Sequence, residues 1–350
     1  MNRILVAPLN WGLGHATRCI PVINMLKKKG FNPVIASDGS SLSLLKKEFP
    51  ENEFIELPGY NIRYTKSGAL LKWKLLTDVP KLMSVIKKEH ELVKSIVKTH
   101  RIDGIISDNR FGIYHPKMPS VFITHQIQIQ SGNTSWISSK VNQGLINKFD
   151  ECWIPDVMGD QSISGKLSDH SQLKIPVRHL GILSRFSPSN EEFQYDLLVL
   201  LSGPEPQRSL LEALVTKELK TFDKKILLVK GVIEDQQQWN KADHITSVNY
   251  LSGSELESAI KASKLVLSRS GYSTVMDLAR LGKKAFFIPT PGQAEQLYLA
   301  KKLEEDKIAP FCSQKQFSMN QFERLAEYSG FSVNYEMSNL EDALSFFESK

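Results

Sequence analysis

The sequence has no long hydrophobic run, few cysteines and no Asp-x-Asp motif. No apolar stretch approaches the roughly 18 to 20 residues that a bilayer-spanning helix needs, and the first residues resemble a β-strand rather than a signal peptide. The three cysteines, Cys19, Cys152 and Cys312, are far apart and form no Cys/His cluster of metal-binding spacing. These absences exclude membrane-spanning proteins, disulfide-rich secreted domains and zinc modules, and they predict a cytoplasmic protein with free, buried thiols.

The composition is that of a globular protein, with 41% apolar and 23% charged residues in a chain of 350. A chain of this length is too long to fold around one core, so two domains are expected. The net charge of +6 divides unevenly. Up to Leu183 there are 24 Lys and Arg against 15 Asp and Glu, or +9, and from Ser184 there are 20 against 23, or −3. The first half is therefore expected to attract an acidic partner, such as an anionic lipid surface, a phosphate or a nucleic acid.

Short β-rich runs alternate with helical segments along the chain, which is typical of a parallel sheet wrapped by helices. A stretch rich in Ser, Pro, Asn and Glu at residues 184–193 interrupts the alternation and suits a surface linker. We therefore predict an α/β chain of two Rossmann-like, doubly wound parallel-sheet domains, residues 1–183 and 194–335. Ligands of such sheets bind beyond the carboxyl ends of the strands, so a cleft between the domains is the expected site.

The segment 69–88 interleaves Trp73 and many leucines with five lysines around Asp78-Val79-Pro80. It is open to two interpretations. The first is a pair of amphipathic helices, with Asp78 capping the second helix and Pro80 in its first turn. The second is a basic, aromatic patch that lies on a membrane surface.

The stretch NWGLGHATR, residues 10–18, follows the first predicted strand and places His15 directly after a glycine turn. Thr17 replaces the third glycine of a dinucleotide fingerprint, and no Gly-Lys-Ser/Thr follows to make a Walker loop. What remains is a turn at Gly12 and Gly14 that lets a substrate approach the backbone amides of a helix N-terminus. His15 is then either a helix-capping residue or a neutral general base whose pKa the helix dipole lowers.

Polar residues end two further predicted strands of the first half. Asp108 follows IDGIIS, and His125 and Gln126 follow PSVFIT. These side chains and His15 are expected at the same edge of the sheet, where a carboxylate that orients an imidazole would activate a hydroxyl by general-base catalysis. The alternative is that Asp108 merely forms a turn before Asn109.

The second half carries turns suited to a phosphorylated ligand. Ser202 and Gly203 lie between a predicted strand and a helix, an anion-binding arrangement if their amides point outward. In LSRSGYSTVMDLARLG, Asp277 lies inside the helix that follows the strand end, where a carboxylate is placed for a ribose diol. Together with PTPGQAEQ at the next strand end, these turns predict a nucleotide-sugar pocket. Its candidate residues are Gly12, Gly14, Ser202, Gly203, Arg269, Ser270, Gly271, Ser273, Thr274, Asp277, Gln293, Glu295 and Gln296.

These motifs make the sequence resemble the GT-B glycosyltransferases over most of its length. RSG with Asp277, followed by PTPGQAEQLYLA, resembles the C-terminal domain of the family 28 enzymes that add N-acetylglucosamine to lipid-linked muramoyl pentapeptide, and more loosely the donor motif of UDP-glycosyltransferases. GLGHATR resembles the Gly-x-Gly-His-x-x-Arg start of related transferases, and THQ resembles the HEQ element of the peptidoglycan enzymes. The resemblance implies the GT-B fold, an acceptor-binding first domain, a donor-binding second domain and a final helix, residues 336–350, that crosses back to the first domain.

The resemblance also implies roles for the polar residues of the first half. His15 and Asp108 match the base and its orienting acid in the UDP-glycosyltransferases. Arg18, His125 and Gln126 fall on the acceptor side.

In the second half, the Ser, Gly and Thr residues of the predicted pocket would line the diphosphate. Asp277 stands where the family has a ribose-binding glutamate, one methylene longer. Glu295 and Gln296 fall where the family has two glutamines on the donor sugar, so Glu295 is a departure that bears on the identity of that sugar.

We therefore expect an inverting glycosyltransferase that moves a sugar, by resemblance an N-acetylhexosamine, from a UDP-sugar to a lipid-linked or envelope glycan acceptor. No metal or other cofactor is expected, because no Asp-x-Asp motif is present; helix N-termini and backbone amides would stabilise the leaving diphosphate. Peripheral contact with an anionic membrane is expected, and nucleic-acid binding is not, since interleaved aromatic residues at strand spacing are absent. The alternatives are a nucleotide-sugar 2-epimerase and a non-catalytic nucleotide-sugar-binding protein.

Overall fold

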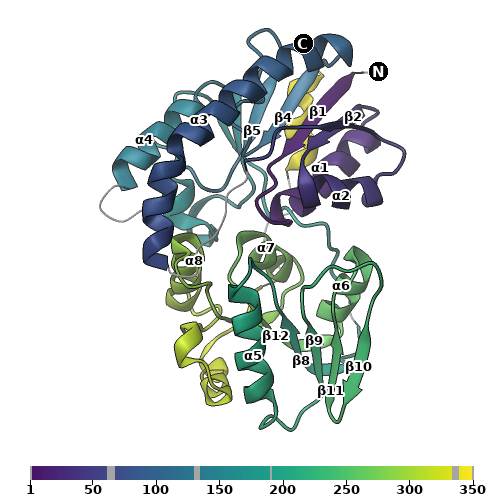
Figure 1. Ribbon diagram of the computed structural model, residues 1–350, viewed down its shortest axis with the longest axis vertical. Coiled ribbons are helices and arrows are strands. Elements are labelled where there is room, and N and C mark those ends of the chain that lie inside the picture. Colours follow the sequence, from purple (N-terminus) through teal and green to yellow (C-terminus); the bar gives the residue numbers. More distant parts are fainter. Residues whose placement is uncertain (1, 61–67, 130–134, 190, 333–338, 349–350) are drawn as a thin grey trace. The chain divides into compact units, whose positions relative to one another are not determined.

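The computed structural model describes residues 2–60, 68–129, 135–189, 191–332 and 339–348, and for residues 68–79 it describes the backbone only. The chain divides into two compact units (Figure 1). The first comprises Met1–Arg63, Lys72–Arg185 and Glu336–Lys350, and the second consists chiefly of Phe186–Tyr335.

The first unit contains a seven-stranded sheet in the order β3-β2-β1-β4-β5-β6-β7. All of its strand pairs are parallel. Its strands are β1 (Arg3–Pro8), β2 (Asn32–Ser37), β3 (Glu53–Glu56), β4 (Gly104–Asp108), β5 (Ser120–Ile123), β6 (Glu151–Ile154) and β7 (Val177–His179). The order changes direction at β1, which is the topological switch point where α/β sheets bind ligands.

Both faces of this sheet are covered by helices, which explains why its central strands are apolar at almost every position. Ile4 and Val6 of β1 pack on one face with helix α1, whereas Leu5 and Ala7 pack on the other face with α3. The helices of the unit are α1 (Gly14–Lys28), α2 (Gly39–Glu48), α3 (Gly68–Thr99) and α4 (Ser135–Ile146), with short 3-10 helices η2 (Gly159–Gln161) and η3 (Gly165–Ser168).

The end of the chain packs on the first unit. Helix α9 (Leu340–Ala343) continues into the 3-10 helix η6 (Leu344–Phe347). Leu340, Leu344 and Phe347 join the core beneath α1, and the Phe347 ring meets Trp153 edge-on at a centroid distance of 6.1 Å. This closing segment therefore completes the apolar core on the α1 face of the first sheet.

The predicted break at Pro80 is wrong, because α3 is one helix from Gly68 to Thr99 that contains this proline. A proline inside a helix removes one backbone hydrogen bond and kinks the helix, but it does not have to end it when the rest of the helix is held by packing. Here Val93 and Ile96 anchor the later turns of α3 in the core. The side chain of Trp73, on which the predicted membrane patch depends, lies outside the described residues.

The second unit contains a six-stranded sheet in the order β10-β11-β9-β8-β12-β13, in which only β10 is antiparallel to its neighbour. Its strands are β8 (Tyr195–Leu200), β9 (Ile226–Val229), β10 (Trp239–Ala242), β11 (Ile245–Val248), β12 (Ser263–Ser268) and β13 (Lys284–Phe287). Its helices are α5 (Gln207–Leu219), α6 (Gly253–Lys261), α7 (Tyr272–Arg280) and α8 (Ala294–Glu305), with 3-10 helices η4 (Gln314–Gln316) and η5 (Met319–Glu327).

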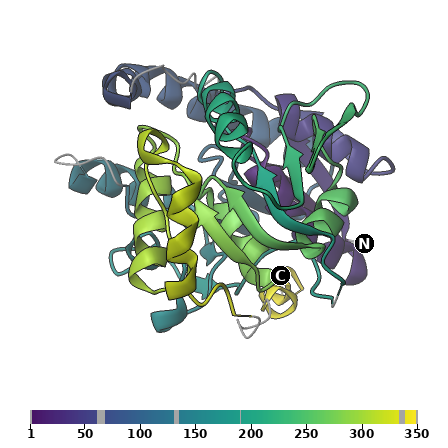
Figure 2. The same cartoon turned by 90° about the horizontal axis from the view of Figure 1, so that it is seen from below.

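Helices lie on both sides of the second sheet as well (Figure 2). Leu197 and Val199 of β8 pack in a cluster with Leu211 and Val215 of α5, while the intervening Leu198 is buried on the other side. Both units are thus α/β layers around a largely parallel sheet, as the alternation of strands and helices predicts.

Two further findings concern the composition. All three cysteines are buried and none forms a disulfide, as their spacing predicts. Among the helices of the described ranges, none is both long and apolar enough to cross a membrane.

Candidate active site

Strand register brings three polar segments to one edge of the first sheet. Asp108, the last residue of β4, lies beside Pro8 at the end of β1 and beside Ile123 at the end of β5. The loop that follows β1 and the residues that follow β5 therefore leave the sheet next to Asp108. This is the carboxyl edge at which the sequence predicts a site.

The glycine turn after β1 opens toward solvent. Gly12 is exposed, has φ +78° and would have no atom within 4 Å of a Cβ atom placed on it, so its backbone conformation, rather than crowding, favours glycine there. Helix α1 begins at Gly14, which puts His15 in its first turn. The side chain of His15 is 15% exposed, so a substrate can reach it.

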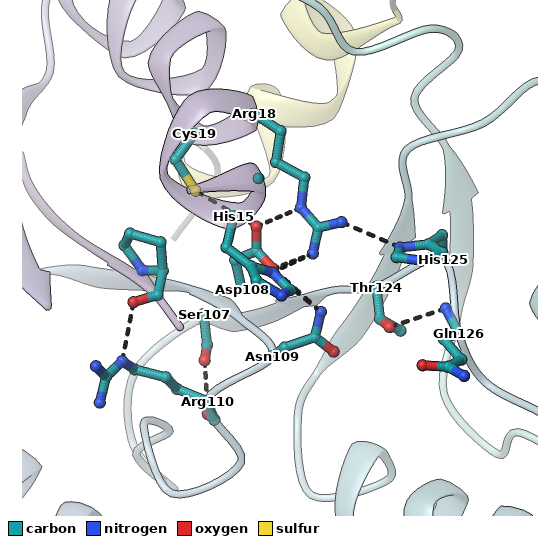
Figure 3. Close-up of polar contacts among 12 residues, drawn as sticks. His15, Arg18, Cys19, Ser107, Asp108, Asn109, Arg110, Thr124, His125 and Gln126 are labelled. Atoms are coloured by element: carbon teal, nitrogen blue, oxygen red, sulfur yellow. Dashed lines mark hydrogen bonds and ion pairs between the residues drawn. The ribbon is translucent and has the colours of Figure 1, made fainter. Parts of the chain in front are cut away.

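His15 and Asp108 are in contact, although 93 residues separate them in sequence. His15 Nδ1 lies 2.9 Å from Asp108 Oδ1 (Figure 3). Burial opposes the charge on Asp108, but Arg18 and His15 together hold the pKa of this carboxyl well below its usual range. Because an ionised carboxylate only accepts hydrogen bonds, an Nδ1–H that donates to Asp108 leaves the lone pair of His15 on Nε2.

The pKa of His15 is lowered from its ordinary value. Burial is the main cause, the positive charge of Arg18 adds to it, and Asp108 acts in the opposite direction. An imidazole whose pKa is lowered stays uncharged to a lower pH than an ordinary histidine, and the uncharged ring is the form that accepts a proton.

Arg18, which is predicted on the acceptor side, is buried against Asp108. Its side chain is 4% exposed and forks onto Asp108, with Nε donating to Oδ2 at 2.5 Å and Nη2 donating to Oδ1. Its other contacts are with His15 Nδ1, 2.7 Å from Nη2, and with His125 Nδ1, 3.0 Å from Nη1. The guanidinium thus joins three residues that come from three different segments.

Other residues at this edge complete the surroundings of Asp108. Asn109, which has φ +57°, donates from Nδ2 to Asp108 Oδ1 at 3.2 Å. His125 is buried, whereas Gln126 is half-buried and its backbone N–H donates to Thr124 Oγ1 at 3.0 Å. His15, Arg18, Asp108 and His125 are therefore brought together, and Gln126 lies next to them in the chain.

A second buried guanidinium, which the sequence analysis does not identify, holds the loops behind this edge. Arg110 is fully buried, donates from Nη1 to Glu89 Oε1 at 2.7 Å, and pairs through Nη2 with Asp38. Asp38 Oδ2 in turn accepts from Asn10 Nδ2 at 3.0 Å, just before the glycine turn. The sequence gives only a weak signal for Arg110, which is that polar residues follow the buried strand β4. Its partners Glu89 and Asp38 lie 21 and 72 residues away.

The carboxyl edge of the second sheet is built in the same way. Ser268 at the end of β12 lies beside Leu200 of β8 and beside Phe287 of β13. The turns that follow these three neighbouring strands contain the predicted nucleotide-sugar residues of this unit. Ser202 is half-buried, and Gly203 is exposed with φ +107°, a conformation that favours glycine.

The structure places Arg269 in the interior rather than in a ligand site. The side chain donates from Nη1 to the carbonyls of Ile288 and Pro289 at 3.0 and 3.2 Å, and from Nη2 to the carbonyl of Gln207 and to Gln314 Oε1 at 3.0 and 2.8 Å. Burial lowers the pKa of Arg269 to about 10. Arg269 is predicted to bind the donor, but these contacts give it a structural role. It connects the end of β12 with the residues that follow β13 and with the start of α5.

The turn between β12 and α7 contains one further internal contact and one open position. Ser270 is fully buried and donates from Oγ to the carbonyl of Gln296 at 2.8 Å, so its hydroxyl joins two turns. Gly271 is the residue before α7, and no atom lies within 4 Å of the position that a Cβ atom would take there. Of this turn, Gly271 and the first residues of α7 are therefore what a ligand can approach.

Helix α7 presents a half-buried strip next to this turn. Ser273, Thr274 and Asp277 are half-buried, whereas Val275 and Met276 are buried. Asp277 follows Ser273 by four positions and Thr274 by three, so the three side chains share one face of the helix. The strip leads from the N-terminus of α7, where an anion is favoured, to the carboxylate predicted to bind a ribose.

The turn after β13 holds the remaining predicted residues. Gln293 precedes α8, and Glu295 and Gln296 lie in its first turn, all three half-buried. Gln296 Oε1 accepts from the backbone N–H of Thr290 at 2.7 Å. The Thr290 hydroxyl, which the sequence analysis does not single out, is buried and has no hydrogen-bond partner in the described part of the chain.

Comparison with known proteins finds similar sequences and a similar fold. Residues 200–338 match the model of the glycosyltransferase family 28 C-terminal domain. Two relatives carry the name UDP-N-acetylglucosamine--N-acetylmuramyl-(pentapeptide) pyrophosphoryl-undecaprenol N-acetylglucosamine transferase. The protein of Clostridium tetani is 23% identical over 88% of this chain and 85% of its own length, and that of Sulfurihydrogenibium sp. is 25% identical over 93% and 89%.

A solved structure shows the fold. MurG of Acinetobacter baumannii superimposes with a TM-score of 0.59 at 12% identity, covering 100% of this chain and 99% of its own. The fold is therefore GT-B, as the sequence predicts. With a family 28 domain over residues 200–338 and relatives of one kind along most of its length, this chain is a GT-B glycosyltransferase that resembles the peptidoglycan N-acetylglucosaminyltransferases.

Proposed function

We propose that this glycosyltransferase moves an N-acetylhexosamine from a UDP-sugar to a lipid-linked or envelope glycan acceptor, with inversion at the anomeric carbon. The observation that carries the proposal is the contact between His15 Nδ1 and Asp108 Oδ1 at the carboxyl edge of the first sheet. A direct displacement by an acceptor hydroxyl needs a base on the side of attack, and a neutral imidazole oriented by a carboxylate is suited to that role. The relatives' names, which specify UDP-N-acetylglucosamine and a lipid-linked acceptor, support the choice of substrates.

We place the donor at the carboxyl edge of the second sheet. Gly203, Gly271 and the N-termini of α7 and α8 would meet the diphosphate, whose charge helix dipoles and backbone amides can stabilise without a metal ion. Asp277 would accept from the ribose hydroxyls. Gln293, Glu295 and Gln296 would reach the sugar.

A panel of UDP- and dTDP-sugars tests the donor. A ligand that binds only the folded protein stabilises it and so raises its melting temperature. At a ligand concentration of 100 times the dissociation constant the stabilisation is about 2.7 kcal/mol. We expect UDP-N-acetylhexosamines to raise the melting temperature and to be consumed when a polyprenyl-diphosphate-linked sugar is added. Protection by dTDP-sugars alone, or by no nucleotide at all, would refute the proposed donor.

We further propose that the first unit rests on an anionic membrane where its acceptor is anchored. Helix α4 exposes Trp136, Ile137 and Val141, with side chains 68%, 49% and 55% exposed, and Lys140 is exposed beside them. Ile137 and Val141 are four residues apart and Trp136 adjoins them, so the three lie on one side of the helix. An apolar strip with a neighbouring lysine is typical of a surface that enters the membrane interface.

Replacing Trp136 with serine should lower binding to vesicles that contain anionic lipid by about 10- to 100-fold, because burying one large apolar side chain contributes about 1.5–3 kcal/mol. Cosedimentation measures the bound fraction, which should also fall with added salt. Trp239→Ser is the matched control, since Trp239 is 52% exposed on β10 of the second unit. Equal losses for both variants, or binding that ignores lipid charge, would contradict the α4 surface.

A further inference from the structure

Arg18 contacts the candidate base His15 and its neighbours Asp108 and His125. Its predicted place on the acceptor side does not require these contacts. It is buried, it forks onto both oxygens of Asp108, and its two terminal nitrogens lie 2.7 Å from His15 Nδ1 and 3.0 Å from His125 Nδ1. Figure 3 shows its guanidinium between the two imidazole rings. The side chain therefore contacts every titratable residue predicted at this edge of the sheet.

The contact with His125 determines which nitrogen of that ring carries the proton. A guanidinium donates hydrogen bonds and accepts none. Arg18 Nη1 must therefore donate to a lone pair on His125 Nδ1. The uncharged ring then carries its proton on Nε2, and His125 presents an N–H donor from that atom rather than a base.

The contact with His15 is of a different kind, because two groups compete for one nitrogen. Asp108 Oδ1, which accepts, lies 2.9 Å from His15 Nδ1, and Arg18 Nη2, which donates, lies 2.7 Å from the same atom. Asp108 favours a proton on Nδ1, and Arg18 disfavours it. Arg18 also disfavours a second proton on the ring, since an imidazolium would lie directly against a guanidinium.

The charges around His15 support the same conclusion. The titratable or charged groups that face it in the described structure are Arg18 on α1, Asp108 on β4 and His125 after β5. Cys19 on α1 contacts Asp108 Oδ2 at 3.6 Å. Burial raises the pKa of the Cys19 thiol, so it adds no charge. The ionised Asp108 and Arg18 then balance, and a protonated His15 would leave a net positive charge in a poorly hydrated site.

We propose that Arg18 is a positioning residue of the active site, which neutralises Asp108, fixes the proton of His125 on Nε2 and keeps His15 uncharged. The uncharged His15 accepts a proton from the acceptor on Nε2 in the form in which its Nδ1–H donates to Asp108. This inference rests on the proposed function only for the last step. The arrangement differs from a simple histidine–aspartate pair, in which an unbalanced carboxylate makes the imidazole a stronger base. Arg18 thereby extends the pH range over which the base is available toward acid.

Titration of the histidine rings by NMR tests the proposal without requiring transfer activity. In the wild-type protein we expect the nitrogen shifts of His125 to show a proton on Nε2, and the His15 midpoint to lie below the ordinary value of about 6.5. Arg18→Gln, which removes the charge but keeps a donor for Asp108, should raise the His15 midpoint by about 1 to 3 pH units. Arg18→Lys, which keeps the charge, should leave it close to that of the wild type.

Arg110→Gln is the matched control. Arg110 is as buried as Arg18 and pairs with the two carboxylates Asp38 and Glu89, yet its side chain points away from His15 (Figure 3). Its loss should destabilise the protein without moving the His15 midpoint. If Arg18→Gln does not fold, the wild-type protein still tests the proposal, since a His125 proton on Nδ1 or a His15 midpoint at or above 6.5 would contradict it.

A wild-type His15 midpoint at or above 6.5, a His125 proton on Nδ1, or an unchanged midpoint in a folded Arg18→Gln variant would each overturn the proposal. The pH dependence of the transfer rate in the acid range distinguishes a failure of this proposal from a failure of the proposed function. If the midpoint moves as expected but transfer does not depend on His15, the role of Arg18 on the imidazole stands and the assignment of the base fails. If transfer depends on His15 but Arg18→Gln leaves the His15 midpoint unchanged, His15 is the base and the proposed role of Arg18 fails.

Discussion

Replacing His15 with alanine should lower the rate of sugar transfer by about 10²- to 10⁴-fold, the loss expected when a general base is removed, while donor binding stays nearly unchanged. The acceptor hydroxyl must lose its proton as it attacks, and without the imidazole only water is left to take it. The donor is placed on the second unit, so its affinity, measured by calorimetry, should remain close to that of the wild type. Initial rates at saturating donor measure the loss.

The pH dependence of the wild-type enzyme follows from the same assignment. The base acts only when it is uncharged, so the rate should fall as the pH drops through the pKa of His15. Burial and Arg18 lower that pKa, and the midpoint of the fall should therefore lie below the ordinary histidine value of about 6.5. The His15→Ala variant should lose this acid limb.

The matched control is His100→Ala. His100 also contacts a carboxylate, Glu53, in the same unit. Glu53 begins β3, so this pair lies at the amino edge of the sheet, opposite His15. His100→Ala should transfer sugar at about the wild-type rate, and a His15→Ala variant that did the same would show that His15 is not the base.

Replacing Asp277 with alanine should weaken UDP binding by roughly one to two orders of magnitude, because hydrogen bonds to a charged group contribute about 1.5 to 3 kcal/mol. The carboxylate lies on the same face of α7 as Ser273 and Thr274 and is half-buried. From that strip it can accept from both hydroxyls of a ribose whose phosphates meet the N-terminus of the helix. The wild type should therefore prefer UDP to 2′-deoxy-UDP, and the variant should lose most of that preference.

Two further variants separate the ribose contact from general damage. Asp277→Asn keeps the size of the side chain and one carbonyl acceptor, so it should retain part of the preference. Asp306→Ala removes a carboxylate near the end of α8, where Asp306 pairs with Lys302. It should bind both nucleotides as the wild type does. If Asp277→Ala discriminates between ribose and deoxyribose as before, Asp277 does not hold the ribose, even if the protein transfers sugar.

The parts of the fold that the sequence predicts are those held by strong local patterns. Strands β1, β4 and β5 are almost wholly buried, and β8 and β12 have buried apolar residues at their centres, so each shows an apolar run that is visible by itself. Strands at the margins of the sheets are not visible in this way. The four residues of β10 are all exposed, and β3 carries glutamate at both ends, so neither differs in composition from a loop.

In helix α3, by contrast, the sequence contains a helix-start signal that the structure does not follow. Pro80 and Asp78 form a good helix start in sequence, yet the chain continues as one helix through them. Packing of Val93 and Ile96 into the core stabilises the later turns, and the loss of one backbone hydrogen bond at the proline is small beside it.

The contact between His15 and Asp108 depends on the pairing of β1 with β4, which only the structure shows, but the sequence predicts that both residues lie at one edge of a sheet, because the carboxyl ends of parallel strands share an edge. The sequence also determined which turns of the second half open at the corresponding edge there, since glycine and small polar residues mark them. The roles of the two arginines of these motifs depend on contacts that only the folded chain brings together. Arg18 and Arg269 look alike in sequence, each in a turn motif at a strand end. Whether a guanidinium faces a ligand or the interior depends on acceptors that arrive from distant segments, here Asp108 for Arg18 and the carbonyls of Ile288, Pro289 and Gln207 for Arg269. A buried charge is stable only where such acceptors surround it. Because these acceptors come from distant segments, no local sequence pattern predicts them.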